Sequence, residues 1–367
     1  MDLRRDRALR VSSFHIDHQV FSATMSRTLL NLCCSLVGAL LGAVAVLGPQ
    51  PALAADWASV FMYHRFGESE WPATNIRLDQ FEAHLEEIRA GGYTVLPLPE
   101  IMTRLRNAAE LPDRTLGITI DDAYASVYAQ AWPRLKKAGL PFTLFVSTDA
   151  VDRSSPGYMT WDQIRELKAA GATIGSQTAS HPHLPDIEIE QVKIELDRAA
   201  QRIADETGER PTLFAYPYGE YGAAVQRVVA ARGYAAAFGQ HSGVAHAGSD
   251  RFGLPRFALN ETYGGVDRFR LTANALPLPV RDRVPADLVL QQNPPTFGFT
   301  VDPSIPDVDR IDCYASGQGR AKVEALGSRV EVRLPEPFPA GRARINCTMP
   351  GPDGRWRWYG VQFYIPR

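Results

Sequence analysis

The sequence predicts an α/β protein: an incomplete parallel (β/α)7 barrel followed by a small all-β, sandwich-like domain. Two observations predict the barrel. Seven short apolar runs alternate with amphipathic segments, and several of those segments end at glycine. A third observation predicts the second domain, because short strand-like runs with period-two alternation follow a proline-rich stretch.

The apolar runs lack polar alternation, as is typical of parallel strands buried on both faces. They are residues 59–63, 93–96, 116–120, 142–146, 173–175, 213–215 and 234–238. Between them, helical patterns occupy residues 78–90, 126–138, 161–170, 188–207 and 223–232. Gly139 and Gly171 follow two of these helices and predict their ends, because glycine accepts the left-handed conformation that closes a helix. Thr160 with Gln163 predicts a capping box at the start of another. Seven strands favour an incomplete barrel over an eight-fold one.

The rest of the chain divides by composition. We expect a catalytic domain at residues 55–275, a proline-rich linker at 276–306 and a small β-sandwich-like domain at 307–367. The strand-like runs of that last domain are residues 310–315, 321–325, 329–334, 343–348 and 356–365. Trp356 and Trp358 share one face of its last strand, where they either stack against sugars or fill the core of the sandwich.

Residues 1–54 are expected to be an N-terminal extension and signal peptide that begins in practice at Met25. Arg27 precedes an apolar stretch at residues 29–47, and Ala52-Leu53-Ala54 fits a signal peptidase site, so the mature chain would start at Ala55. The alternative is a retained membrane anchor, because the apolar stretch is long enough to span a bilayer. Either way we expect an exported protein, which is periplasmic, secreted or anchored to the envelope.

Cysteine usage agrees with export. Two of the four cysteines lie in the apolar stretch, which leaves Cys313 and Cys347. They either form one disulfide, worth about 3–4 kcal/mol for this spacing, or are two unrelated buried thiols. The formal net charge of −2 and the lack of a basic cluster beyond the far N-terminus exclude nucleic acid as an expected partner, and the oligomeric state is not predicted.

Polar residues gather where four of the predicted strands end. Asp121 and Asp122 follow the run at residues 116–120, and adjacent side chains at a strand end point in different directions. One carboxylate could therefore ligate a metal while the other acts as a base; alternatively, the pair caps the next helix. Tyr63-His64, Gln177-Thr178-Ala179-Ser180-His181 and Tyr216-Pro217-Tyr218-Gly219 follow three other strands. Since the carboxyl ends of parallel strands meet at one edge, we predict an active site there.

With these motifs the sequence resembles the polysaccharide deacetylases, carbohydrate esterases with a nodulation protein B homology domain. The resemblance covers about residues 60–257 and includes the opening Phe61-Met62-Tyr63-His64. Thr119-Ile120-Asp121-Asp122 matches the family motif Thr-Phe-Asp-Asp, which implies that Asp121 is the general base and Asp122 a metal ligand. Residues 177–181 align with His-Ser/Thr-x-x-His, so His181 and Gln177 are the other implied ligands of a divalent metal, most simply zinc.

The resemblance also implies roles for the remaining motif residues. The backbone N–H of Tyr218, after Pro217, would stabilise the oxyanion, and we expect Trp161, Tyr216 and Pro217 to contact the substrate. This sequence departs from the family pattern at three points. Gln177 replaces a ligand histidine, Ala215 replaces an arginine that pairs with the base, and no Leu-x-His segment supplies the acid. We expect Arg256 to replace the arginine and His64 to act as the acid.

The implied reaction is metal-assisted removal of N-acetyl groups from an amino-sugar polysaccharide or oligosaccharide. Two alternatives remain open. One is a catalytically silent carbohydrate-binding protein on the same fold, which Gln177 favours. The other is an O-acetyl esterase on a xylan-like glycan, which would use the same site.

Overall fold

The computed structural model describes residues 54–366, all within one compact unit, Ala52–Arg367. Six parallel strands form its main sheet in the spatial order β11-β10-β9-β8-β7-β2. They are β2 (Trp57–Tyr63), β7 (Thr115–Asp121), β8 (Thr143–Val146), β9 (Thr173–Ser176), β10 (Leu213–Ala215) and β11 (Ala236–Phe238). The seventh predicted strand is the short β5 (Thr94–Val95), which pairs in parallel with β7.

The two ends of this sheet curl towards each other. Strand β13 (Phe257–Ala258) runs parallel to β2 on the side away from β7, and β12 (Ala245–His246) is antiparallel to β2. Just before β13, Leu254 forms a parallel bridge with Phe238 of β11. Short pairings therefore connect β11 back to β2, and the predicted incomplete β/α barrel is confirmed.

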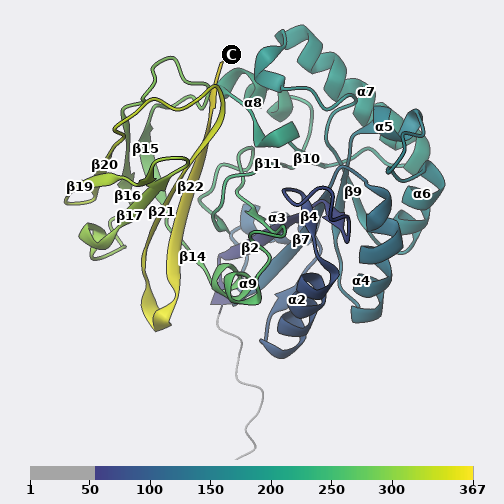
Figure 1. Ribbon diagram of the computed structural model, residues 1–367, viewed down its shortest axis with the longest axis horizontal. Helices are drawn as coiled ribbons and strands as arrows, with labels where there is room; N and C mark the ends of the chain where they lie inside the picture. Colours follow the sequence, from purple (N-terminus) through teal and green to yellow (C-terminus); the bar gives the residue numbers. More distant parts are fainter. Residues whose placement is uncertain (1–53, 367) are drawn as a thin grey trace, which may run out of the picture. The chain divides into compact units, whose positions relative to one another are not determined.

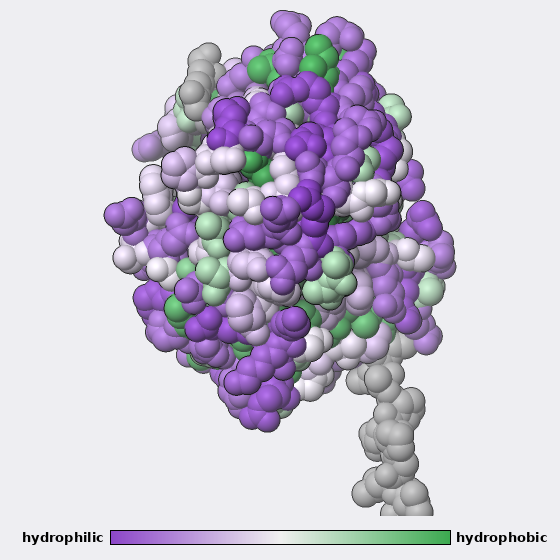
Figure 2. All heavy atoms as spheres, turned by 90° about the vertical axis from the view of Figure 1, so that its right-hand side faces the viewer, coloured by the Kyte–Doolittle hydropathy of each residue, from purple (hydrophilic) through white to green (hydrophobic). Residues whose placement is uncertain are grey.

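Helices cover the outside of the curved sheet (Figure 1). They are α2 (Leu78–Ala90), α4 (Trp132–Ala138), α5 (Thr148–Asp152), α6 (Trp161–Ala169), α7 (Ile189–Thr207), α8 (Ala223–Ala230) and α9 (Val266–Ala273). Helix α3 (Leu98–Arg106) instead packs against Gly117, on the inner face of the sheet. The predicted capping box starts α6, since Gln163 N–H donates to Thr160 Oγ1 at 3.3 Å and Thr160 N–H donates to Gln163 Oε1 at 3.0 Å. The face over α4 to α7 is mostly hydrophilic, with small scattered hydrophobic areas (Figure 2). This agrees with amphipathic helices whose apolar sides face the sheet.

Two antiparallel sheets make up most of the C-terminal part. One contains β22 (Trp356–Ile365), β21 (Gly341–Pro350), β17 (Asp312–Ala315) and β18 (Gly319–Arg320), with β14 (Leu276–Pro277) parallel to β22 at its edge. The other has the order β15-β16-β20-β19, with bounds Val280–Val284, Phe297–Val301, Arg329–Arg333 and Lys322–Leu326. Buried residues from both sheets share one core, in which Phe297 of β16 meets Phe363 of β22 with 5.6 Å between ring centroids. The predicted all-β region is confirmed.

The predicted disulfide is present. Cys313 and Cys347 are register partners on β17 and β21, and their sulfur atoms are bonded. Both residues are fully buried between the two sheets. The bridge therefore ties two neighbouring strands of the sandwich core.

The stretch at residues 276–306, which we expected to be a linker, contains β14, β15 and β16. Its prolines obscured these strands in the sequence. Pro277 and Pro279 lie at or beside the short edge strand β14, and Pro285, Pro294 and Pro295 lie between β15 and β16. Proline is tolerated at such positions because no ladder N–H is needed there. The domain boundaries drawn from composition stay a prediction.

The N-terminal part of the prediction, residues 1–53, lies outside the described residues, and so does the apolar stretch within it. In residues 54–366 we find no helix with the length and apolar character needed to cross a membrane.

Candidate active site

Asp121 ends the central strand β7, whose residues are all buried. Its carboxylate forms a bidentate ion pair with Arg256: Nη1 donates to Oδ1 at 2.7 Å and Nη2 to Oδ2 at 2.8 Å. Both side chains are fully buried. The guanidinium also donates to the Gly239 carbonyl and to Thr119 Oγ1, at 3.0 and 3.1 Å. A bidentate pair with these extra bonds satisfies a buried carboxylate that would otherwise be costly to desolvate.

His64 lies beside this pair at the end of β2. Its Nε2 is 3.9 Å from Asp121 Oδ2, and its side chain keeps 13% of its surface exposed. The register of β2 with β7 explains the proximity, because Tyr63 is opposite Ile120, which puts His64 opposite Asp121. The imidazole thus lies next to the buried carboxylate and keeps part of its own surface exposed.

The neighbouring Asp122 has a different environment. Its Oδ1 is buried and has no hydrogen-bond partner among the described residues, although His181 Nε2 is 3.4 Å away. Burial alone would raise the pKa of Asp122, but the imidazoles of His181 and His64 outweigh this effect and lower the pKa to about 2. Asp122 is therefore an ionised carboxylate with one buried oxygen that lacks a hydrogen bond from the described residues.

Gln177, at the end of β9, closes this cluster. Its side-chain Nε2 is 3.2 Å from His181 Nε2, while its Oε1 accepts a hydrogen bond from the Asp122 N–H at 3.4 Å. The amide thus presents its nitrogen, not its oxygen, to the imidazole. An amide can exchange these two atoms by rotation, so its oxygen can also reach the position between His181 and Asp122.

Backbone conformation marks the same cluster. Asp122, Thr178, His181 and Tyr218 all have positive φ angles, of 73°, 68°, 59° and 57°. Non-glycine residues seldom adopt this region, and they do so mostly where function requires a particular placement. Three of the predicted motifs therefore carry locally strained turns.

The turn at residues 216–219 brings aromatic rings to the cluster. The Tyr218 ring stacks on His183 with centroids 4.3 Å apart and meets the edge of His181 at 4.5 Å. The two hydrogen bonds of the turn are donated by Gly219 and Glu220, so neither uses the Tyr218 N–H. Gln362 Nε2 on β22 donates to the Tyr218 carbonyl at 3.0 Å. The C-terminal sheet thus holds this turn from behind.

A metal ion would find two strong donors here, Asp122 Oδ1 and His181 Nε2. Among residues 54–366, no group of three or more His, Cys, Asp or Glu side chains converges to hold a metal. The open Asp122 oxygen fits a cation, and the Gln177 amide is the third donor within reach. Because an amide oxygen is a weaker zinc donor than imidazole, the residues fit a metal site of reduced donor strength.

The structure does not bring the side chains of Trp161 and Tyr216 into this cluster. Trp161 is 8% exposed, and its Nε1 donates to Asp152 Oδ1 at 2.7 Å. Tyr216 is fully buried, stacks on Tyr221 and donates its hydroxyl hydrogen to the Phe252 carbonyl. Pro217 is buried as well. These contacts account for Trp161 and Tyr216 as packing residues that support the turns around the site.

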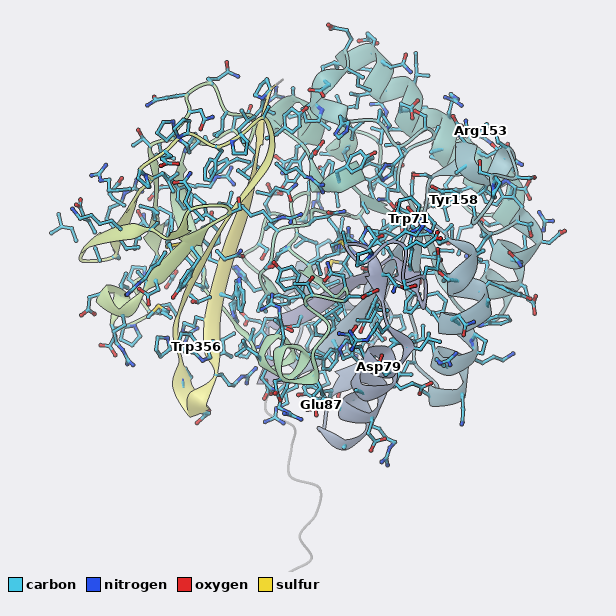
Figure 3. All side chains as sticks on the ribbon, in the orientation of Figure 1. Trp71, Asp79, Glu87, Arg153, Tyr158 and Trp356 are labelled. Carbon is cyan, nitrogen blue, oxygen red and sulfur yellow. A yellow bond between two sulfur atoms is a disulfide. The ribbon has the colours of Figure 1, made fainter. Side chains whose placement is uncertain are left out.

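Sequence reasoning missed an aromatic group next to Asp122. The Tyr124 ring is 4.9 Å from that of Tyr158, and the Arg65 guanidinium carbon lies 3.5 Å from the Tyr124 centroid and 5.0 Å from that of Trp71. Trp71 and Tyr158 appear near each other in Figure 3, and Trp71 is 53% exposed. Their adjacency to the motifs in sequence was the available signal, since Arg65 follows His64 and Tyr124 closely follows Asp122.

The fold and this cluster define an α/β-barrel enzyme whose site combines carboxylates and imidazoles at the carboxyl edge of the strands. The family model described as polysaccharide deacetylase matches residues 108–237 of this chain. The matched range contains the Asp121-Asp122 pair, the segment with Gln177 and His181, and the Tyr218 turn.

Relatives in two bacteria are similar over parts of the chain. One is a Bacillus subtilis protein, YxkH, whose name assigns it provisionally to the polysaccharide deacetylases. It is 24% identical over 206 residues, which cover 56% of this chain and 72% of YxkH. The other is poly-beta-1,6-N-acetyl-D-glucosamine N-deacetylase of Staphylococcus aureus, 25% identical over 129 residues. That match spans 35% of this chain and 44% of the staphylococcal protein.

Solved structures share the fold. The Streptococcus pyogenes deacetylase PplD, in complex with acetate, matches with a TM-score of 0.56 at 22% identity, over 59% of this chain and 98% of PplD. IcaB from Ammonifex degensii matches with a TM-score of 0.55 at 24% identity, over 60% of this chain and 98% of IcaB. Since almost all of each neighbour is matched, this chain carries segments that those two chains lack.

Proposed function

We propose that the protein hydrolyses N-acetyl groups on an amino-sugar polysaccharide or oligosaccharide. The observation that carries the proposal is that two adjacent carboxylates have different local environments. Asp121 is fixed by Arg256, and Asp122 keeps an open oxygen beside His181. The names of the staphylococcal relative, an N-deacetylase of poly-N-acetylglucosamine, and of PplD support the same reaction.

In this proposal, one residue accepts a proton from water and another donates a proton to the leaving group. The Asp121 carboxylate takes a proton from water as the oxygen of that water attacks the acetyl carbonyl carbon. The Tyr218 N–H donates to the oxyanion that forms, a contribution of about 3 kcal/mol. His64, as imidazolium, gives a proton to the leaving nitrogen when the carbon–nitrogen bond breaks. The products are acetate and a free amino sugar.

Arg256 supports the base without touching the substrate. Its two hydrogen bonds hold both oxygens of Asp121 in place. It thereby takes the place of the arginine that the sequence lacks at position 215, which is alanine.

Asp122, His181 and Gln177 would hold a divalent cation, for which zinc is the expected metal. Such an ion would polarise the acetyl carbonyl and acidify a bound water. A silent binding protein is the second candidate, because the Gln177 amide nitrogen faces His181.

The proposal also includes export, with a mature chain that begins near Ala55. The Cys313–Cys347 disulfide supports it, because such bonds persist in oxidising compartments. Intact mass spectrometry of the exported protein tests this, and a retained N-terminal segment would contradict the cleavage.

The main test is acetate release by the purified protein from N-acetylated β-1,4- and β-1,6-linked glucosamine oligomers and from acetylated xylan. We expect release from an N-acetylated oligomer that is lost in Asp121→Asn. Release from the xylan alone would replace the proposal by an O-acetyl esterase. Glycan binding without any release, with zinc present, would favour the silent binding protein.

A further inference from the structure

A cavity of about 440 Å³ lies between the barrel and the C-terminal strands, apart from the Asp121–His181 cluster. Its walls carry four aromatic residues and two arginines: Tyr263, Arg268, Tyr314, Arg344, Trp356 and Trp358. We refer to these six residues as the aromatic groove. Tyr263 and Arg268 come from α9 and the loop before it, and the others come from β17, β21 and β22. The volume falls within the range typical of small-molecule sites.

Three aromatic rings of the groove are unusually open to solvent. Tyr263, Tyr314 and Trp356 are 49%, 46% and 40% exposed, and all three are among the large hydrophobic residues that the described surface displays. Figure 3 shows Trp356 near the start of β22. Trp358, two residues further on the same face, is 9% exposed and donates from Nε1 to Asn346 Oδ1 at 3.2 Å. Exposed aromatic surface that gathers in one concave site indicates a ligand with apolar faces.

The same groove contains cations without acidic partners. No carboxylate of residues 54–366 lies within 4 Å of the Arg268 or Arg344 guanidinium. The carbon of the Arg268 guanidinium is 5.2 Å from the Tyr263 ring centroid and 5.3 Å from that of Trp358. Its Nε is buried and has no hydrogen-bond partner in the described part of the chain. A donor without an acceptor, held between two aromatic faces, points to a ligand that supplies oxygen acceptors.

The groove adjoins the catalytic cluster through three short connections. Gln240, which also lines the cavity, follows Gly239, whose carbonyl accepts from Arg256 Nε. Ala258, another lining residue, ends β13 and lies two residues after Arg256. Arg344 Nε donates to Gln362 Oε1 at 2.8 Å, and Gln362 in turn donates to the Tyr218 carbonyl. Gln240 follows the end of β11 and Ala258 ends β13, and both strands are parallel in the barrel. These two lining residues therefore lie at the same carboxyl edge as the site.

Resting on the proposed function, we propose that the aromatic groove binds further sugar residues of the glycan whose acetyl group lies at Asp121 and Asp122. Sugar rings have apolar faces that stack on aromatic side chains, and their hydroxyl and acetamide oxygens accept hydrogen bonds from arginine. The groove thus makes the enzyme selective for chains over single sugars. The C-terminal strands supply most of this surface and thereby take part in substrate selection.

Binding and turnover are measured with N-acetylglucosamine disaccharides and hexamers, in both β-1,4 and β-1,6 linkage. Trp356→Ala and Tyr314→Ala remove exposed rings, and Arg268→Gln removes the unpaired cation. Leu326→Ala, at a residue that is 85% exposed on β19 and outside the groove, is the matched control. Calorimetric titration in the Asp121→Asn background separates binding from catalysis.

We expect each groove variant to weaken hexamer binding about tenfold, the effect of losing one aromatic or charged contact. The kcat/KM for the hexamer should fall equally, while the value for the disaccharide and the thermal midpoint stay unchanged. Hexamer affinity that is unaltered in all three variants, equal losses for both lengths, or a wild-type protein that binds neither hexamer would overturn the groove. Hexamer binding that depends on the groove without acetate release from any glycan would instead overturn the proposed function and leave the groove standing.

Discussion

Asp121 and Asp122 are adjacent in the chain, yet the two halves of the site around them differ in how the carboxylate is hydrogen-bonded. Around Asp121 every polar atom of the carboxylate is satisfied by a buried guanidinium held at 2.7 and 2.8 Å. Around Asp122 one buried oxygen has no hydrogen-bond partner among the described residues, and the backbone takes a left-handed turn. The difference teaches that Arg256 completes the first half, whereas the second half keeps one carboxylate oxygen without a hydrogen bond from the described residues.

The largest effect should come from separating these two halves by mutation. Asp121→Asn should lower acetate release by about 10³-fold or more, because the general base is lost, while zinc binding stays close to wild type. Asp122→Ala should lose both, because it removes a ligand. Colorimetric acetate assays and zinc titrations of both variants check this, and equal zinc loss in the two variants would contradict the division of roles.

Much of this comparison was available from the sequence. The parallel strands, the helices α2, α6 and α7, and the edge at which the motifs meet follow from hydrophobic patterns and glycine stops, because these are local signals. The placement of Arg256 beside Asp121 also agreed with expectation, but only the missing arginine at position 215 drew attention to it.

The parts that sequence could not supply depend on distant contacts. The strands β15 and β16 pair within a proline-rich stretch, and short loops with positive φ set the orientation of Gln177 and His181. Likewise, Gln362 reaches the Tyr218 carbonyl across 144 residues of sequence. The burial of Tyr216 and Trp161 is also a tertiary property, and motif matching alone does not distinguish such packing roles from contact with substrate.

The completeness of the Asp121 half can be tested by removing its cation. Arg256→Met leaves a buried carboxylate without a partner, so the free energy of unfolding should fall by about 3–5 kcal/mol. Arg270→Met is a control, since the Arg270–Glu87 pair has a similar 2.7 Å contact but Arg270 is 51% exposed. That control should cost at most about 1 kcal/mol. Urea denaturation measures both, and equal losses would show that the buried pair has no special weight.

A variant far from both halves tests whether the C-terminal sandwich affects the catalytic cluster. Replacing Cys313 and Cys347 together by alanine removes a bridge that closes a separation of 34 residues. The free energy of unfolding should fall by about 3–4 kcal/mol, because the unfolded chain regains its freedom. Turnover of a disaccharide by the folded variant should not change, as neither residue reaches the site. A selective loss of disaccharide turnover at full folding would show that the sandwich shapes the catalytic cluster directly.

The smallest expected effect comes from replacing Gln177, the weakest of the proposed metal donors beside Asp122. Gln177→His replaces an amide, whose nitrogen lies 3.2 Å from His181 Nε2, by an imidazole that binds zinc well. We expect zinc affinity to rise at least roughly tenfold, comparable to the effect of a supporting residue around a metal site. Gln177→Asn, which keeps an amide but shortens it, is the control and should not tighten binding. Calorimetric zinc titrations decide the matter, together with acetate assays before and after chelation. If affinity is the same in Gln177→His and the wild type, Gln177 does not lie at a metal position. If wild-type turnover survives exhaustive chelation, Asp122 keeps its open oxygen for a water or a substrate group, and the reaction runs on the Asp121 half alone.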